Sequence, residues 1–465
     1  MTRPHILLTS RWRNISPVRG LPTHVFAVVA GCAALLCGCA VYHAKPLPQA
    51  PDLARLPVLS IPASRLAIDG LKPAPMDLAK GLNEINIVTL AVVDNPQLKA
   101  VRLASGVARA QLLAAGLLPD PQISGGLSKS SLMTGYSVSL VEDIGALLTR
   151  GAAEDAARAH LRQVRLNILW QEWQVAERAR QLFIENRARA KLCRVLDARR
   201  KLLAQLYHAD LHALHQGDAT TGGITADFIA LKSAETAYAN LELKYNKARH
   251  ALDALLGLAP NVHLPLRGSS DAERVTLAQY RSAISSLPHR RPDLLALQAG
   301  YHSAEARLRE AILAQFPLIG AGVSKAQSAG DGIPSIGFNV TLTLPLFNRN
   351  QGSIAVARAT RAKLFQAYEA HLDAATGEAD KVWTAIAIMR RQLRSLTLQL
   401  ADFARTAAVA RTSFAAGTLS LRDFARLDDN VLTTRAQIIQ LRASLQVAQT
   451  ALATILVLPP AEAGS

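Results

Sequence analysis

The sequence has few aromatic residues, and this shortage bounds the fold. Phe, Trp and Tyr make up 5% of the 465 residues, whereas half of the chain is apolar. Ala and Leu supply most of the apolar content, so the composition favours helices over an all-β or mixed enzyme fold. The length is sufficient for a large core and for two or three domains.

Cysteine is also scarce, which excludes a disulfide framework. Of the four cysteines, Cys32, Cys37 and Cys39 lie in one N-terminal apolar stretch, and only Cys193 lies in the body of the chain. The histidines are scattered, and the sequence has no Cys/His spacing typical of a metal site. His208 and His212 have the spacing of one helix face, where a polar helix surface is the simpler interpretation.

Acidic residues do not balance the basic ones, and the formal net charge is +17. Such an excess is typical of a protein that binds nucleic acid or a membrane surface, or that lines a charged lumen. A solvated Arg-rich helix surface would give the same excess. The sequence lacks a basic-aromatic nucleic-acid module. It also lacks a phosphate-binding loop, a catalytic-triad spacing and a paired-carboxylate motif. We therefore predict a protein that is not an enzyme, holds no cofactor or metal and binds no nucleic acid.

Residues 1–38 have the pattern of a secretory signal. Basic residues precede an apolar run from Val25 to Leu36, which is too short to span a bilayer. The run ends in Leu36-Cys37-Gly38-Cys39, which has the shape of a lipoprotein cleavage site. We predict Cys39 as the lipid-attached mature N-terminus, with ordinary signal cleavage nearby as the alternative. Residues 39–80 are Pro-rich and predict an extended tether.

An internal repeat organises the rest of the chain. Shifted by 196 residues, residues 95–129 align with residues 291–325 without a gap, and both Pro96 and Pro121 meet prolines. The same shift brings Asp227-Phe228 onto Asp423-Phe424. We predict one structural unit used twice, over residues 81–265 and 266–465.

The sequence of each unit predicts a helix, a β-hairpin, a very long helix, a turn and a helix that returns alongside the long one. In the first unit we expect a helix over 95–118, strands within 122–142, a helix over 149–209 and a return helix that ends near residue 258. In the second we expect a helix over 292–315, strands within 318–344 and a helix of about sixty residues from Gly352. The first long helix has two apolar stripes at heptad-like spacing, which is typical of a helix packed on both sides in a barrel of coiled coils.

The predicted hairpins alternate apolar with small or polar residues, the pattern of strands between lipid and water. Four strands cannot close a barrel, and open edges are not tolerated in hydrocarbon. Three copies would supply twelve strands, so we predict a homotrimer with a 12-stranded β-barrel and a continuous tube of helices. The alternative is a soluble protein with two exposed hairpins.

Taken together, these features resemble the TolC-like outer-membrane efflux family, in its lipoprotein branch, over nearly all of the mature chain. The most specific stretches are Arg290-Arg291-Pro292-Asp293-Leu294, Phe316-Pro317 and Leu344-Pro-Leu-Phe-Asn-Arg-Asn-Gln-Gly352. The resemblance implies a mainly α protein with a β-barrel in the outer membrane above a periplasmic helical tunnel. It also implies a periplasmic adaptor and an inner-membrane pump as partners.

The resemblance places adaptor contacts and a gate at the two helical turns. The candidate tips are Gly217, Gly417 and Thr418, and the family pattern has acids six and nine residues after the second glycine. Asp423 occupies the first of these places, whereas Arg426 occupies the second and departs from the pattern. Arg426 could pair with Asp423 to hold the tip shut, or the two could form an ordinary surface ion pair. Asp227 is a further gate candidate, but an insertion over 217–223 is expected to alter the first tip.

These observations predict a passive, gated export duct of a tripartite pump for small toxic compounds or metal ions. One alternative is the outlet of a protein-secretion system, and another is a structural periplasmic coiled-coil lipoprotein. The strand pairs and their repeat argue against the structural lipoprotein.

Overall fold

The computed structural model describes residues 42–51, 53, 81–129, 134–218, 220–260, 262–268, 274–316, 318–329 and 333–458. The predicted signal, Cys39 and most of the predicted tether lie outside the described residues. All helices and strands below belong to the compact unit Leu53–Ser465.

The first unit begins with three short helices, α2 (Glu84–Asp94), α3 (Pro96–Arg102) and α4 (Ala104–Gly116). Asn95 begins α3 by accepting a hydrogen bond from the Leu98 N–H at 2.9 Å, and Pro96 takes the first helical position as predicted. The single helix expected over 95–118 is interrupted at Leu103, whose N–H bonds to the Ala100 carbonyl, three residues back.

The hairpin and the long helices follow in the predicted order. Strands β1 (Gln122–Lys129) and β2 (Thr134–Asp143) lead into α5 (Gly145–His215) and the return helix α6 (Thr221–Leu255). At 1.5 Å per residue, the 71 residues of α5 span about 105 Å. The prediction of this helix was correct, and the observed helix extends beyond both predicted ends.

The second unit repeats this order with α7 (Leu277–Arg290), α8 (Pro292–Leu313), β3 (Leu318–Gln327), β4 (Pro334–Thr343), α9 (Gln351–Ala415) and α10 (Leu421–Ile455). The sequence interpretation missed α2 and α7. Each begins with a capping box, formed by Asn83 with Asn86 and by Thr276 with Gln279. In α7 this signal is masked by Pro288 inside the helix.

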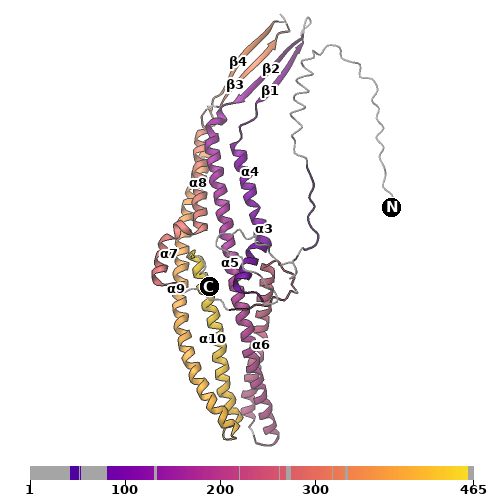
Figure 1. The fold of residues 1–465 in the computed structure, drawn as a ribbon. Helices are drawn as coiled ribbons and strands as arrows, with labels where there is room; N and C mark the ends of the chain where they lie inside the picture. Colours follow the sequence, from indigo (N-terminus) through magenta and orange to yellow (C-terminus); the bar gives the residue numbers. More distant parts are fainter. Residues whose placement is uncertain are drawn as a thin grey trace, which may run out of the picture. The chain divides into compact units, whose positions relative to one another are not determined.

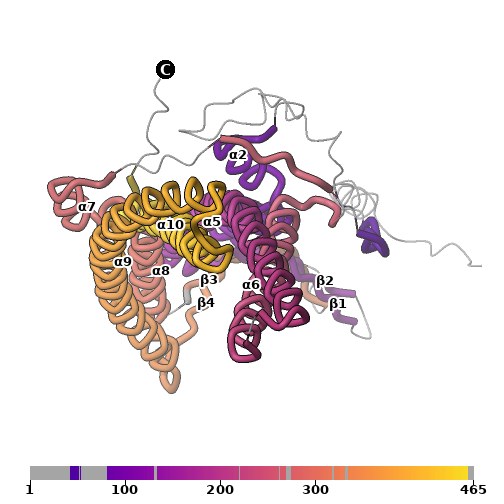
Figure 2. The backbone as a smooth tube through the Cα atoms, turned by 90° about the horizontal axis from the view of Figure 1, so that it is seen from below, coloured from indigo at the N-terminus to yellow at the C-terminus, as the bar shows by residue number. Residues whose placement is uncertain are grey.

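Helices α4, α5, α6, α8, α9 and α10 form a single curved layer, and α2 and α7 lie outside it (Figures 1 and 2). On the side of the helical turns the neighbours are α9, α10, α5 and α6 in that order, and on the side of the sheet they are α4, α5, α8 and α9. Helix α5 thus packs on several neighbours, as its two apolar stripes predict. The four strands form one antiparallel sheet in the order β1-β2-β3-β4.

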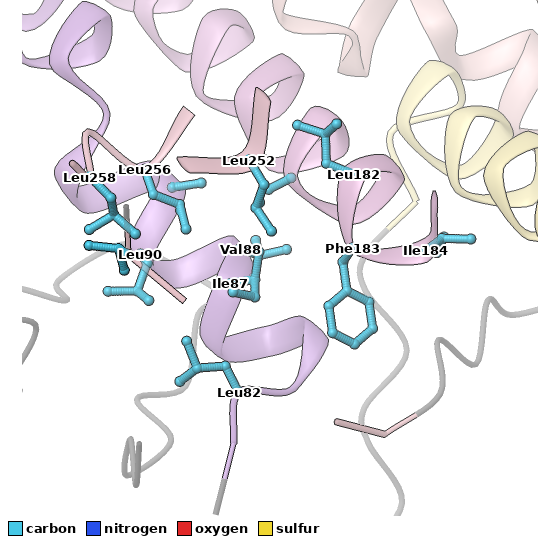
Figure 3. Close-up of a cluster of buried hydrophobic side chains, with 13 residues drawn as sticks. Leu82, Ile87, Val88, Leu90, Leu182, Phe183, Ile184, Leu252, Leu256 and Leu258 are labelled. Atoms are coloured by element: carbon cyan, nitrogen blue, oxygen red, sulfur yellow. The ribbon is translucent and has the colours of Figure 1, made fainter. Parts of the chain in front are cut away.

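Two apolar cores hold this layer together at mid-length. In the first, α2 covers α5 and the end of α6, and Ile87, Leu90, Phe183, Leu252 and Leu256 are almost fully buried (Figure 3). The second core joins α7, α9 and α10 in the same way and includes Ala283, Ile386, Leu452 and Leu456. Each fully buried Leu, Ile or Phe side chain stabilises the folded chain by about 1.5–3 kcal/mol. The short helices α2 and α7 therefore stabilise the packing of the long helices on one another.

The structure corrects the alignment of the two units. The shift of 196 holds from α3 to β1, where the buried Leu98 corresponds to Leu294. Beyond the hairpins the helices correspond at a shift of 200, because α6 and α10 both have 35 residues and begin at Thr221 and Leu421. Ala179 and Ala379, both fully buried, agree with this shift. Asp227 therefore corresponds to Leu427, and its predicted equivalence with Asp423 is wrong.

Candidate functional site: the sheet faces and the helical turns

One face of the four-stranded sheet is mainly apolar, although Lys129, Glu142 and Lys325 also belong to it. Cross-strand partners such as Ile123, Leu140, Val323 and Phe338 lie in one row across all four strands. Successive side chains of a strand point to opposite faces of the sheet, so residues two positions away from this row along each strand lie on the same face. Its apolar members are exposed in the single chain: Ile123, Leu127, Val138, Leu140, Ile319, Val323, Ile336, Phe338, Val340 and Leu342. An exposed apolar surface of this kind indicates contact with lipid or with another protein.

The opposite face carries small and hydroxyl side chains. Ser124 and Ser139 are cross-strand partners whose hydroxyl oxygens lie 2.7 Å apart. In the second hairpin, Ser324 donates to the Gly337 carbonyl at 3.3 Å. A Cβ at Gly322 would lie 2.6 Å from the Leu140 carbonyl oxygen, so this position has no room for a side chain. The two faces thus have the polarity expected for lipid on one side and water on the other.

Strands β1 and β4 are the two edges of this sheet. Among the described residues, each pairs with one strand and has no partner strand on its other side. Backbone groups in hydrocarbon must be paired, so a sheet of this polarity is incomplete in a single chain.

The two helical turns have the same geometry. Gly217 has a φ of +84° and Gly417 a φ of +72°, a conformation that favours glycine. The following residue bonds back to the helix in both: the Asp218 N–H to the Ala213 carbonyl at 2.8 Å, and the Thr418 N–H to the Ser413 carbonyl at 2.9 Å. The next helix starts four residues after each glycine, so the insertion expected over 217–223 is wrong.

Asp423 lies at the second turn, in the first turn of α10, which is capped by Ser420. Its N–H donates to the Ser420 hydroxyl oxygen at 3.1 Å, and its carboxylate lies 2.7 Å from the same oxygen. Both Asp423 and Arg426 are exposed. Within the part of the chain that the structure describes, no ion pair joins them, so the predicted pairing is not present in the single chain. The capping geometry explains why they do not meet, because it turns the carboxylate back toward Ser420.

The charged cluster at the turns is centred on Arg422, which the sequence interpretation missed. Its Nη2 lies 2.5 Å from Asp210 Oδ2 on α5 and 3.0 Å from Asp227 Oδ2 on α6. A Cβ at Gly223 would lie 2.8 Å from the Arg422 guanidinium, so the glycine makes room for it. Arg422 therefore joins the second unit to both long helices of the first.

The two carboxyl groups of this cluster influence each other. Burial, together with a hydrogen bond to Asp210, raises the pKa of Asp227 to about 6 in spite of Arg422 and Arg426 nearby. Burial also acts on Asp210, but hydrogen bonds from Asp227 and Arg422 hold the pKa of Asp210 below its usual value. The pair thus retains a proton at mildly acidic pH, and Asp227 is the group that carries it.

A second ion pair lies farther along the same contact between α5 and α10. Arg199 Nε lies 2.6 Å from Asp429 Oδ1, and Arg199 Nη2 lies 3.1 Å from Asp429 Oδ2. This bidentate geometry is the strong form of an Arg–carboxylate contact. The two units of one chain are thus joined by ion pairs at two levels.

The Arg-Arg-Pro-Asp stretch joins α8 to both of its neighbours. Arg291 lies over the Trp170 ring of α5 at 4.7 Å and donates from Nε to Asp293 at 2.9 Å. Asp293 also lies 2.7 Å from His371 Nε2 of α9. This stretch therefore has a packing role, at the level where α8 begins.

Within the described residues, no group of three or more His, Cys, Asp or Glu side chains could hold a metal ion. No helix in those same ranges is both long and apolar enough to cross a membrane. The described part of the chain thus combines a sheet that has one mainly apolar face with a layer of very long helices.

Comparisons with known proteins relate this architecture to a family. The family described as outer membrane efflux protein matches residues 283–456. No curated protein matches the sequence. The resemblance to TolC-like outer-membrane efflux proteins is thereby confirmed, and proteins of this family are transport channels rather than enzymes.

Several solved channel structures share the fold. CusC is 19% identical, with a TM-score of 0.65 over 88% of this chain and 99% of its own. The CmeC outer membrane channel of Campylobacter jejuni is 15% identical, with a TM-score of 0.65 over 90% of this chain and 94% of its own. The open MtrE channel of Neisseria gonorrhoeae is 16% identical, with a TM-score of 0.65 over 80% and 88%. At these identities the likeness shows the fold.

Proposed function

We propose that this chain is one subunit of a trimeric outer-membrane duct for passive export from the cell. The sheet carries the proposal, because one face is mainly apolar and exposed, the other carries mainly small and polar side chains, and neither edge has a partner strand among the described residues. Three copies would supply twelve strands and leave no edge in the lipid. The same operation would gather the long helices into a tube below the sheet.

In this assembly the duct is the outer-membrane part of a tripartite efflux pump. A periplasmic adaptor would contact the turns at Gly217, Gly417 and Thr418, and an inner-membrane pump would supply the energy. The printed descriptions of CmeC and MtrE as outer membrane channels support export as the role. Small toxic compounds or metal ions are the proposed cargo.

Purified protein in planar bilayers tests the duct. We expect a trimer in detergent and discrete conductance steps after insertion. A matched control replaces Phe338 by Arg, which places a charge at the middle of the apolar face and costs about 2–4 kcal/mol in lipid. This variant should insert poorly. A monomer that shows no conductance would refute the duct.

We also propose that Cys39 anchors the mature chain to the membrane through lipid. Several acyl chains together bind a bilayer far more firmly than one. Cells grown with labelled palmitate should label the wild type, and Cys39→Ser should remove the label. Label retained in Cys39→Ser would exclude this attachment site.

The gate of the proposed duct lies at the helical turns. Arg422 and Asp227 hold the two units of a chain together there, while Asp423 and Arg426 are exposed where copies would meet. Arg422→Ala should loosen the turns and raise the resting conductance. Asp423→Ala tests the exposed carboxylate separately, and an unchanged channel would remove Asp423 from the gate.

A further inference from the structure

The contact between two copies can be inferred from the contact that the two units make within one chain. The order of helices leaves α9 at one end of the curved layer, with α4 and α6 at the other. In the alignment of the units, α9 corresponds to α5, α4 to α8 and α6 to α10. The ends of the layer are therefore the counterparts of surfaces that already pack together inside the chain.

One internal contact shows this most clearly. The Ser303 hydroxyl of α8 donates to the Ala156 carbonyl of α5 at 2.8 Å, and both residues are buried. At shifts of 196 and 200 their counterparts are Val107 on α4 and Val356 on α9. These valines are 60% and 68% exposed, although both are apolar.

Other counterparts follow the same rule. Ala299 of α8 is 2% exposed, whereas its counterpart Leu103, the residue just before α4, is 74% exposed. Ala443 of α10 packs against the first apolar core, whereas its counterpart Leu243 of α6 is 70% exposed. Large apolar side chains thus occupy, on the free ends of the layer, the positions whose counterparts are covered inside the chain.

We propose that a second copy of this chain covers these positions, with its α4 and α6 against α9 of the first copy, so that Val107 meets Val356 across the interface. The proposal rests on the trimeric duct and adds to it the residues that touch. Because the same operation applies at each copy, the interface is heterologous, and it closes after three copies into a ring.

Cysteine cross-linking tests the pairing. In a Cys193→Ser background, Val107→Cys with Val356→Cys should form disulfides between copies when outer membranes are oxidised. Most of the protein should then migrate as covalent dimers and trimers on non-reducing gels. Ser303→Cys with Ala156→Cys is the matched pair inside the chain and should leave the protein at the mass of one chain.

An out-of-register control combines Val107→Cys with Ala370→Cys, which lies about 21 Å farther along α9. This pair and each single cysteine should give no covalent trimer. Cross-linking of the out-of-register pair, or none at Val107 and Val356 in a protein that remains trimeric in detergent, would overturn the pairing and leave the duct intact. Absence of any trimer would overturn both.

Discussion

At the scale of single residues, Val457 shows how the two units differ in strain. It has a φ of +51°, which is unfavourable for a β-branched residue, and its counterpart at a shift of 200 is Gly257 with a φ of +67°. Val457→Gly should therefore stabilise the protein by about 1 kcal/mol, since the relieved strain exceeds the added backbone entropy of the unfolded chain. Chemical unfolding in detergent measures the change.

The reverse substitution is the matched control. A Cβ at Gly257 would lie 3.1 Å from Pro96 Cγ and 3.3 Å from the Asp94 carbonyl oxygen. Gly257→Val should therefore destabilise the protein by about 2 kcal/mol, from strain and crowding together. Equal effects of the two substitutions would show that the positive φ is not the cause.

The sequence could indicate which residue types lie at the turns, but not which of them meet. Gly217 and Gly417 were predictable, because a glycine after a long helix is a local signal. Arg422 was not, because its partners lie 212 and 195 residues away in the chain. Asp227 was a gate candidate because the shift of 196 aligned it with Asp423, and that alignment is wrong. It nevertheless belongs to the charged cluster at the turns, because it contacts Arg422.

At the scale of elements, the contact of α5, α6 and α10 should depend on pH. The pKa of Asp227 is raised from its ordinary value of 3.8 to about 6. Between these two pH values the folded state keeps a proton on Asp227 that the unfolded state has lost. The contribution of this group to stability is therefore full below the ordinary pKa and decreases as pH rises through about 6. The slope cannot exceed about 1.4 kcal/mol per pH unit for one proton.

Asp227→Asn should remove this dependence, so that the variant gains stability relative to the wild type between pH 5 and pH 7. Unfolding at several pH values measures it, and hydrogen exchange in α6 and α10 locates it. Asp423→Asn is the control, because it removes an exposed carboxylate from the same turn without touching the pair. Parallel curves for wild type and Asp227→Asn would contradict the assignment.

The order of elements was largely predictable, whereas short helices and the alignment were not. Long uninterrupted apolar periodicity identifies α5 and α9, and prolines and alternation identify the hairpins. Helices α2 and α7 depend on burial against α5 and α9, which no local pattern reports. The shift of four residues at the hairpins equals about one helical turn, so a sequence comparison still found matching residues in α6 and α10.

At the scale of the whole molecule, the two kinds of contact around the proposed ring are unequal. Inside a chain, α5 and α10 are joined by Arg199 with Asp429 and by Arg422 with Asp210 and Asp227. Between copies, the counterparts of Arg199 and Asp429 are Gln399 and Ile229, and that of Arg422 is Gly222. None of these can form an ion pair. The contact between copies is therefore the weaker one near the turns, and the duct should open there.

Locking each contact in turn tests this prediction. In the Cys193→Ser background, Gln399→Cys with Ile229→Cys should join neighbouring copies, and Arg199→Cys with Asp429→Cys should join the two units of one chain. Because opening is expected between copies, a disulfide at the first pair should abolish channel opening in planar bilayers, and a reductant should restore it. A disulfide at the second pair should leave opening unchanged, since the units of one chain move together. Loss of opening with the second pair alone would show that the duct opens within each chain instead.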